Sequence, residues 1–239
     1  MDSNDRIRPY TENPTYWQYK GQPVLMVGGS KTDHLFLLDD LEDHLDDIQA
    51  AGGNYVRNTM SQREEKARKP HFLRPDGRFD LDVWNDDYWQ RFDNMLRWTA
   101  ERDIIVQIEV WDRFDYSQGF WEHSPWNPGN NVNYTYEVSG FAPHYPLHPA
   151  TDVHPFFHTI PEMTEYRPHY DLIRAYQERF VSQMLSYSLP HGHVLYCMNN
   201  ETSTDPRWGQ YWIRYIQGAA TRAGVTLYTT DMFDDTWRG

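Results

Sequence analysis

Short apolar runs alternate with amphipathic stretches along most of the chain. The runs lie at 24–29, 54–60, 104–111, 193–198 and 224–230, and most of them are flanked by turn residues. Short, continuous apolar runs are typical of strands buried on both faces of a parallel sheet. We therefore predict five strands at these positions.

Four stretches between these runs carry apolar residues at helical spacing. They cover 39–51, 85–101, a segment that opens at Pro168 or His169, and 207–223. Gly52-Gly53 ends the first, and Asn85-Asp86-Asp87 caps the second. Strand–helix alternation of this kind predicts a parallel sheet with right-handed crossovers. No glycine-rich phosphate-binding motif follows the first run, so a nucleotide-binding fold has little support.

Three segments lack a clear period. Residues 1–22 form a predicted N-terminal leader packed on the body, which is a single domain over 23–239. Residues 61–84 are predicted as a loop with a turn at Pro75–Arg78. The insertion at 113–168 is too aromatic for a solvated tail. It is either one wall of a binding site, with Trp121 and Trp126 stacking on sugar rings, or a structural lid over the core.

Charge and composition narrow the classes of partner. The net charge is -13, from 22 basic and 35 acidic side chains, which disfavours nucleic acids and anionic membranes as partners. The single cysteine permits no internal disulfide. We expect no signal peptide and no membrane span in this chain, because no apolar run approaches the roughly 18 residues of a span. A secreted or periplasmic location stays open if a leader was removed.

Polar side chains follow the predicted strands at one edge of the sheet. Carboxylates beside Arg and Asn are what cleavage of a glycosidic bond requires, because one acid protonates the leaving oxygen while a second carboxylate attacks or activates water. Plainer interpretations stay open: Asn200-Glu201 as helix-capping residues, Glu109 as a structural partner of Arg57, and His34 as a loop histidine. The edge collects His34, Arg57, Asn58, Glu109, Trp111, Asp112, Asn200, Glu201 and Asp231.

The order of these motifs resembles the first half of the retaining (β/α)8 glycoside hydrolases, the clan with an Asn-Glu pair at the end of its fourth strand. The resemblance rests on 53–57, Phe92-Asp93, 104–111 and Asn200-Glu201, and it covers about residues 13–235. The long aromatic loop and the opening Asn13-Pro14 to Gly21–Val24 are similar to the apiosidase-like branch.

That resemblance implies an α/β fold of TIM-barrel type, truncated after the fifth strand, with carbohydrate as substrate and no cofactor. It implies Glu201 as general acid/base, Asn200 as the ligand of a sugar hydroxyl and Arg57 as the residue that orients a catalytic carboxylate. The clan's nucleophile ends strand seven. The chain is therefore expected to be a fragment of a longer enzyme, or an incomplete barrel that self-associates through exposed sheet edges. Glu109, Asp112 or Asp231 are alternative second carboxylates.

Two other functions remain open. A non-catalytic carbohydrate-binding protein would use the aromatic loop, and a metal-dependent hydrolase would need ligands at the strand ends. The histidine pairs offer little for a metal, because Pro155 interrupts the spacing of His154 and His158, while His191 and His193 precede their strand.

Overall fold

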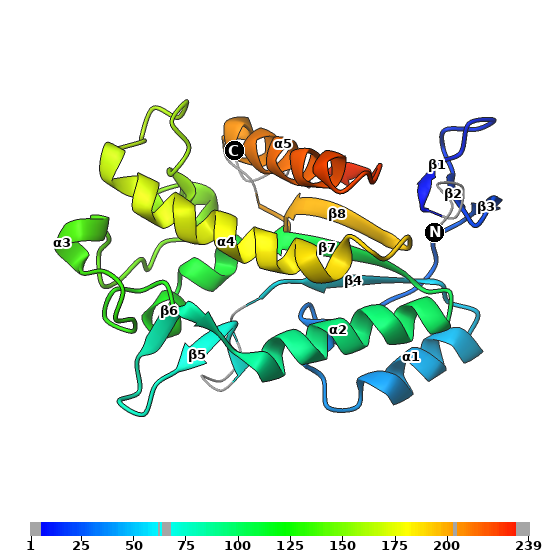
Figure 1. Ribbon diagram of the computed structural model, residues 1–239, viewed down its shortest axis with the longest axis horizontal. Coiled ribbons are helices and arrows are strands. Elements are labelled where there is room, and N and C mark those ends of the chain that lie inside the picture. Colours follow the sequence, from blue (N-terminus) through cyan, green and yellow to red (C-terminus); the bar gives the residue numbers. More distant parts are fainter. Residues whose placement is uncertain (1–5, 62, 64–67, 203–204, 233–239) are drawn as a thin grey trace.

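The protein is built around a four-stranded parallel sheet (Figure 1). The computed structural model describes residues 6–61, 63, 68–202 and 205–232. The sheet order is β4 (Tyr55–Thr59), β7 (Ile105–Trp111), β8 (Val194–Asn199) and β9 (Thr229–Thr230). Thr59 pairs with Glu109 and Trp111 pairs with Asn199, so the carboxyl ends of three strands meet at one edge.

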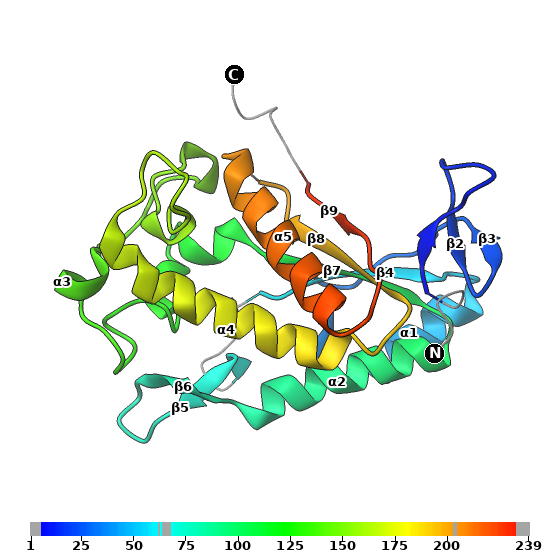
Figure 2. The ribbon, with the colours of Figure 1, turned by 45° about the horizontal axis from the view of Figure 1, so that its top comes forward.

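Helices cover one face of this sheet (Figures 1 and 2). They are α1 (Leu41–Ala50), α2 (Asp86–Glu101), α4 (Asp171–Ser188) and α5 (Pro206–Arg222), close to the predicted bounds. Local signals set their starts: the Asn85 side chain accepts from Asp87 N at 3.2 Å, and Asp205 accepts from Arg207 N at 2.9 Å with Pro206 at the first helical position. Each helix turns an apolar stripe toward the strands.

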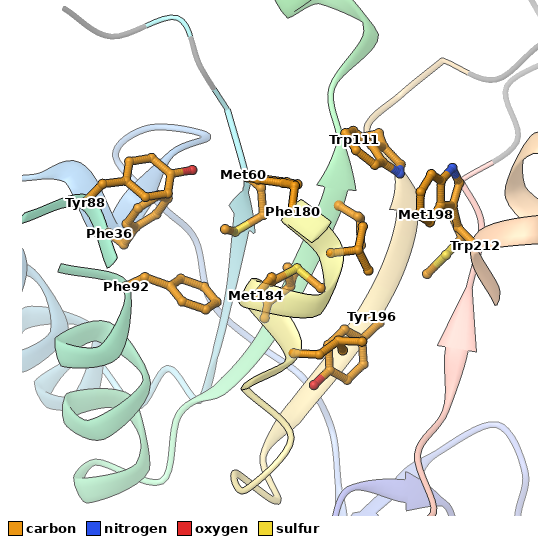
Figure 3. Packing of buried hydrophobic residues seen from close by; sticks show 14 of the residues in the cluster. Phe36, Met60, Tyr88, Phe92, Trp111, Phe180, Met184, Tyr196, Met198 and Trp212 are labelled. Atoms are coloured by element: carbon orange, nitrogen blue, oxygen red, sulfur yellow. The ribbon is translucent and has the colours of Figure 1, made fainter. Parts of the chain in front are cut away.

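The core between sheet and helices is strongly aromatic. Trp111 at the end of β7 lies 5.1 Å from Trp212 of α5 and 5.6 Å from Phe180 of α4, measured between ring centroids (Figure 3). Tyr196 and Met198 of β8 face the same helices, and both are fully buried. Burial of rings of this size supplies a large share of the hydrophobic stabilisation and fixes the strand ends firmly.

The opposite face of the sheet is covered at the amino ends of the strands. There β1 (Arg8–Pro9), β2 (Trp17–Tyr19) and β3 (Gln22–Val24) form a small antiparallel sheet. Trp17 and Tyr19 pack on a second apolar cluster that includes Ile105 and Leu195. The predicted boundary between residues 22 and 23 falls inside β3.

The prediction of a first buried strand at 24–29 is wrong. Leu25 and Val27 are 67% and 53% exposed, and only Gly28 bridges the sheet, at Tyr55. The Asn54 side chain replaces strand pairing here, because it accepts from Val27 N at 2.8 Å and donates to Leu25 O at 3.1 Å. A Cβ at Gly28 would lie 1.8 Å from Tyr55 O, so the two backbones meet too closely for any side chain.

Two other predictions of loops and strands need correction. The 61–84 segment contains a hairpin of β5 (His71–Leu73) and β6 (Phe79–Trp84), in which buried Phe79 and Leu81 alternate with Asp80 and Asp82. The fifth predicted strand is reduced to the two residues of β9. Parts of the predicted segments, namely 1–5, 62, 64–67, 203–204 and 233–239, lie outside the described residues.

The insertion at 113–168 contains α3 (Tyr136–Ser139) and several short 3₁₀ turns, and it forms one β-bridge to a named strand, between Asn131 and Phe79 of β6. Its aromatic side chains pack on one another and on the core, as in the stacked pair of Tyr116 and Phe156, whose centroids are 4.2 Å apart. The insertion is thus a folded part of the domain.

Candidate active site

Side chains from β4, β7 and the turn after β8 form one continuous polar network at the carboxyl edge of the sheet. Arg57 donates from Nε to Glu109 Oε1 at 2.6 Å and from Nη2 to Glu109 Oε2 at 3.1 Å. The same Nη2 donates to Asn200 Oδ1 at 2.8 Å. The structure therefore brings together three residues that the sequence placed at separate strand ends.

Glu109 is the buried end of this network. Its side chain is 0% exposed, whereas that of Arg57 is 36% exposed. Burial raises the pKa of Glu109, while the hydrogen bonds from Arg57 and from Gln107 oppose that rise. The pKa of Arg57 is raised, chiefly by the bond to Glu109. Glu109 thus fixes the Arg57 guanidinium from the buried side, and the Glu109 carboxylate itself is out of reach of a ligand.

Asn200 is oriented from two sides. Its Oδ1 accepts from Arg57, and its Nδ2 donates to Asp112 Oδ2 at 3.2 Å. Its backbone N donates to Trp111 O at 2.9 Å, which continues the β7–β8 pairing. With oxygen and nitrogen each fixed by a charged partner, the amide has one orientation.

Glu201 stands on a strained turn directly after this amide. Its φ is +52°, in the left-handed region that non-glycine residues rarely adopt. Thr202 N donates to Asn200 O at 2.6 Å, and Glu201 N points to Met232 Sδ at 3.3 Å. The side chain is exposed at the edge of the network. Such strain costs about 1–3 kcal/mol and concentrates at functional sites.

Asp231 directly follows β9 and lies in a neighbouring network with residues of β8 and α5. It accepts from Asn199 Nδ2 at 2.7 Å, and Asn199 Oδ1 accepts from Trp208 Nε1 at 3.1 Å. Burial raises the pKa of Asp231. A Cβ at Gly209 would lie 1.9 Å from Asp231 Oδ2, so this glycine admits the carboxylate against α5. Asp231 joins β9 to β8 and α5.

The structure gives Asn58 and His34 local roles. Asn58 is fully buried, and its Oδ1 accepts from Phe36 N at 3.1 Å. The His34 Nε2 is paired with Thr32 Oγ1 at 3.1 Å, just before a 3₁₀ turn. Its burial leaves Asn58 no free surface for a substrate in this structure, so the prediction that it binds substrate gains no support here.

The three tryptophans predicted to contact substrate are packing residues. Trp111, Trp121 and Trp126 are each no more than 1% exposed. Trp121 donates from Nε1 to Ala142 O at 2.9 Å, inside the insertion. Buried rings with this many aromatic neighbours offer no free face to a sugar in this structure, so the predicted stacking by Trp121 and Trp126 gains no support here. The lid interpretation of the insertion fits their burial.

Sequence reasoning missed several members of the two networks. Two aspartates three residues apart directly after β7, Asp112 and Asp115, could have indicated that a cation such as Arg63 binds there. The missed residues are Arg63, Gln107, Asp115, Asn199 and Trp208.

No group of three His, Cys, Asp or Glu side chains among the described residues is arranged to hold a metal ion. Over the same residues, no helix has both the length and the apolar content that crossing a bilayer demands.

Solved structures of glycoside hydrolases share this fold. A glycoside hydrolase family 5 mannosidase from Rhizomucor miehei is 12% identical, with a TM-score of 0.59 over 99% of this chain and 57% of its own. An endo-1,4-β-mannanase from the same organism is 12% identical, with a TM-score of 0.54 over 85% and 56%. Endo-glycoceramidase II from Rhodococcus sp. is 17% identical, with a TM-score of 0.51 over 88% and 49%.

No protein-family model matches the sequence, and no curated protein is detectably similar to it. The chain spans about half the length of the solved structures above. At these identities the likeness establishes the fold. The predicted fold class, a parallel α/β fold of TIM-barrel type, is confirmed.

Proposed function

We propose that this chain belongs to a glycoside hydrolase that cleaves O-glycosyl bonds of an oligo- or polysaccharide, with Glu201 as general acid/base. The observation that carries the proposal is an exposed carboxylate on a strained turn, directly after an amide locked by Arg57 and Asp112. The solved structures that share the fold include a mannosidase, a mannanase and a glycoceramidase, which supports the reaction class.

The roles follow from exposure and contacts. Glu201 reaches solvent and can give a proton to a leaving oxygen and later take one from water. Asn200 is 3% exposed and would present its remaining Nδ2 proton to a sugar hydroxyl at that small opening, and Arg57 would face the same space with its exposed edge. Glu109 and Asp112 act on substrate only through Arg57 and Asn200, because both carboxylates are buried.

Retention of configuration needs a second carboxylate about 5–5.5 Å from the first. Each candidate carboxylate accepts a hydrogen bond from a protein side chain: Glu109 from Arg57, Asp112 from Asn200 and Asp231 from Asn199. We place the nucleophile outside the described residues, as the resemblance to the retaining clan implies. A mechanism-based fluoroglycoside should then label none of these three residues, and a label on any of them would contradict this placement.

Hydrolysis is tested in the protein as its gene encodes it, with aryl glycosides that include mannosides and, following the resemblance to the apiosidase-like branch, apiosides. Glu201→Gln should lower kcat by roughly 10²–10⁴-fold, the usual contribution of an acid/base. Glu165→Gln, an exposed carboxylate in the insertion, is the matched control and should leave kcat unchanged. External azide should restore turnover of activated substrates by Glu201→Ala.

Three outcomes would count against the proposal. Unchanged hydrolysis in Glu201→Gln removes this residue from the mechanism. Loss of activity with a chelator indicates a metal-dependent hydrolase. Sugar binding without turnover in the unsubstituted protein favours a carbohydrate-binding protein.

Self-association is a second element of the proposal. Within the described residues, the edge of β4 away from β7 has one β-bridge, at Gly28, and isolated bonds such as Thr59 N to Asp33 O at 2.6 Å, and β9 is two residues long, so neither edge is paired with a full strand. Sedimentation of this chain should show a concentration-dependent dimer, and a monomer at all concentrations would refute it.

A further inference from the structure

Arg63 lies between three carboxylates beside the candidate active site. Its Nε is 2.9 Å from Asp115 Oδ1, its Nη2 is 3.6 Å from Asp33 Oδ2, and the same Nη2 forms an ion pair with Asp112 Oδ2. The Arg63 side chain is 23% exposed, while those of Asp112 and Asp115 are 0% and 2% exposed. Arg63 is thus the cation that two buried carboxylates share.

Asp112 uses both of its oxygens. Oδ1 accepts from Phe114 N at 3.0 Å, and Oδ2 accepts from Arg63 and from Asn200 Nδ2. Burial raises the pKa of Asp112, and Arg63 opposes the rise. An unpaired carboxylate in this position would be costly, because Asp33 and Asp115 repel it and water is excluded.

Asn200 depends on that carboxylate for one of its two fixed contacts. Arg57 holds Oδ1, but a bond to the oxygen alone leaves the amide able to swing about it. The bond from Nδ2 to Asp112 Oδ2 removes this freedom. Arg63 contacts Asp112, Asp112 contacts Asn200, and Asn200 contacts Arg57. Glu201 follows Asn200 in the sequence.

We propose that Arg63 is a positioning residue of the candidate active site: it holds the Asp112 carboxylate in the place that locks the Asn200 amide beside Glu201. This inference rests on the proposed function for its kinetic consequence, while its structural content stands independently. Arg63 touches no substrate in this scheme. It acts through Asp112, and a misplacement of the amide by about 1 Å is enough to cost up to roughly 100-fold in rate.

The structural arm of the test needs no turnover. The side-chain amide protons of Asn200 are assigned in ¹⁵N spectra by their disappearance in Asn200→Asp, and their exchange with solvent is followed. Arg63→Ala should speed this exchange roughly tenfold or more, the equivalent of about 1.4 kcal/mol of lost coupling. Arg63→Lys keeps a cation beside Asp112 and should retain most of the protection.

The kinetic arm uses the same variants. Arg63→Ala should lower kcat by about 10–100-fold with little change in KM, because the lost interaction matters in the transition state. Methylguanidinium, added far below denaturing concentrations, should restore kcat and slow amide exchange by filling the partly exposed space. The double variant Arg63→Ala/Asp112→Asn should have a kcat no lower than that of the slower single variant, because Arg63 acts through Asp112.

Arg91→Ala is the matched control. Arg91 is 26% exposed and pairs with Asp39 and Asp87 on the outside of α2. The exchange of the Asn200 amide protons and kcat should therefore stay unchanged in this variant, and methylguanidinium should have no effect on either. Wild-type Asn200 exchange in Arg63→Ala would overturn the inference, as would full additivity with Asp112→Asn. If the protein proves inactive on every glycoside, the exchange data alone still decide whether Arg63 positions Asn200.

Discussion

Replacing Arg57 by Met removes one partner of a buried ion pair and leaves the other in place. Among the described residues, the Glu109 carboxylate then keeps only the bond from Gln107 Nε2 at 3.2 Å, and its side chain is 0% exposed. Breaking a buried pair from one side typically costs about 3–5 kcal/mol of unfolding free energy. Because Arg57 is 36% exposed, water can enter where it stood, and we expect the lower end, about 3 kcal/mol.

The loss depends on pH with a definite sign. The pKa of Glu109 in the folded protein is already raised by burial, and Arg57 opposes the rise, so its removal raises that pKa further. An acid with a raised folded-state pKa binds more protons folded than unfolded, so stability falls as pH rises from the unfolded to the folded value. The deficit of Arg57→Met should therefore be smaller near pH 5 than at pH 8.

Urea unfolding followed by circular dichroism at both pH values measures this difference. At pH 8 the melting temperature should also drop by about 6–12 °C, given about 2–4 °C per kcal/mol for a chain of this size. Arg97→Met, which breaks an exposed pair with Asp93, is the control and should have almost no effect. Adding Glu109→Gln to Arg57→Met should recover most of the loss. An equal deficit at both pH values, without recovery in the double variant, would refute the reasoning.

Gly209→Ala places a Cβ 1.9 Å from Asp231 Oδ2 and should cost about 1–3 kcal/mol in urea unfolding; Gly218→Ala in the same helix meets no such atom and should stabilise by about 0.5–1 kcal/mol. Trp121→Ala should lower stability by about 3–5 kcal/mol, because the ring is fully buried, and an unchanged unfolding midpoint would contradict its packing role. The single thiol, Cys197, is 1% exposed and burial raises its pKa to about 12, so thiol reagents at pH 8 should react only after unfolding; rapid reaction of the native protein would contradict this burial.

The helices could be predicted because their signals are local. The Asn85 cap and the apolar spacing that follows it define α2 without any knowledge of the rest of the chain. The hairpin at 71–84 was missed although Phe79, Asp80, Leu81 and Asp82 alternate as strand residues do, since the neighbouring turn made the segment look irregular.

The errors arise where a distant partner decides the outcome. The run at 24–29 is as apolar as a core strand, yet the Asn54 side chain takes the hydrogen bonds that strand pairing would have used. Composition cannot tell whether Trp121 faces a sugar or the core, since both environments favour an indole ring. Arg63 meets carboxylates 49 and 52 positions along the chain, at Asp112 and Asp115, and no local pattern encodes such a meeting.

The amino-terminal segment has a consequence for the order of folding. Ile7 N donates to Gly192 O at 2.7 Å, and Arg6 donates to Leu189 O and His191 O at 3.0 and 3.1 Å, across 183–185 positions. At about 5–20 residues per second, a ribosome needs roughly 10–40 s to reach these acceptors after it has added Arg6 and Ile7. During that time Ile105 lacks the cover that Ile7 and Leu195 give it. Arg6 and Ile7 thus reach their final contacts only after Leu189 to Gly192 have been made, and this side of the sheet closes late in synthesis.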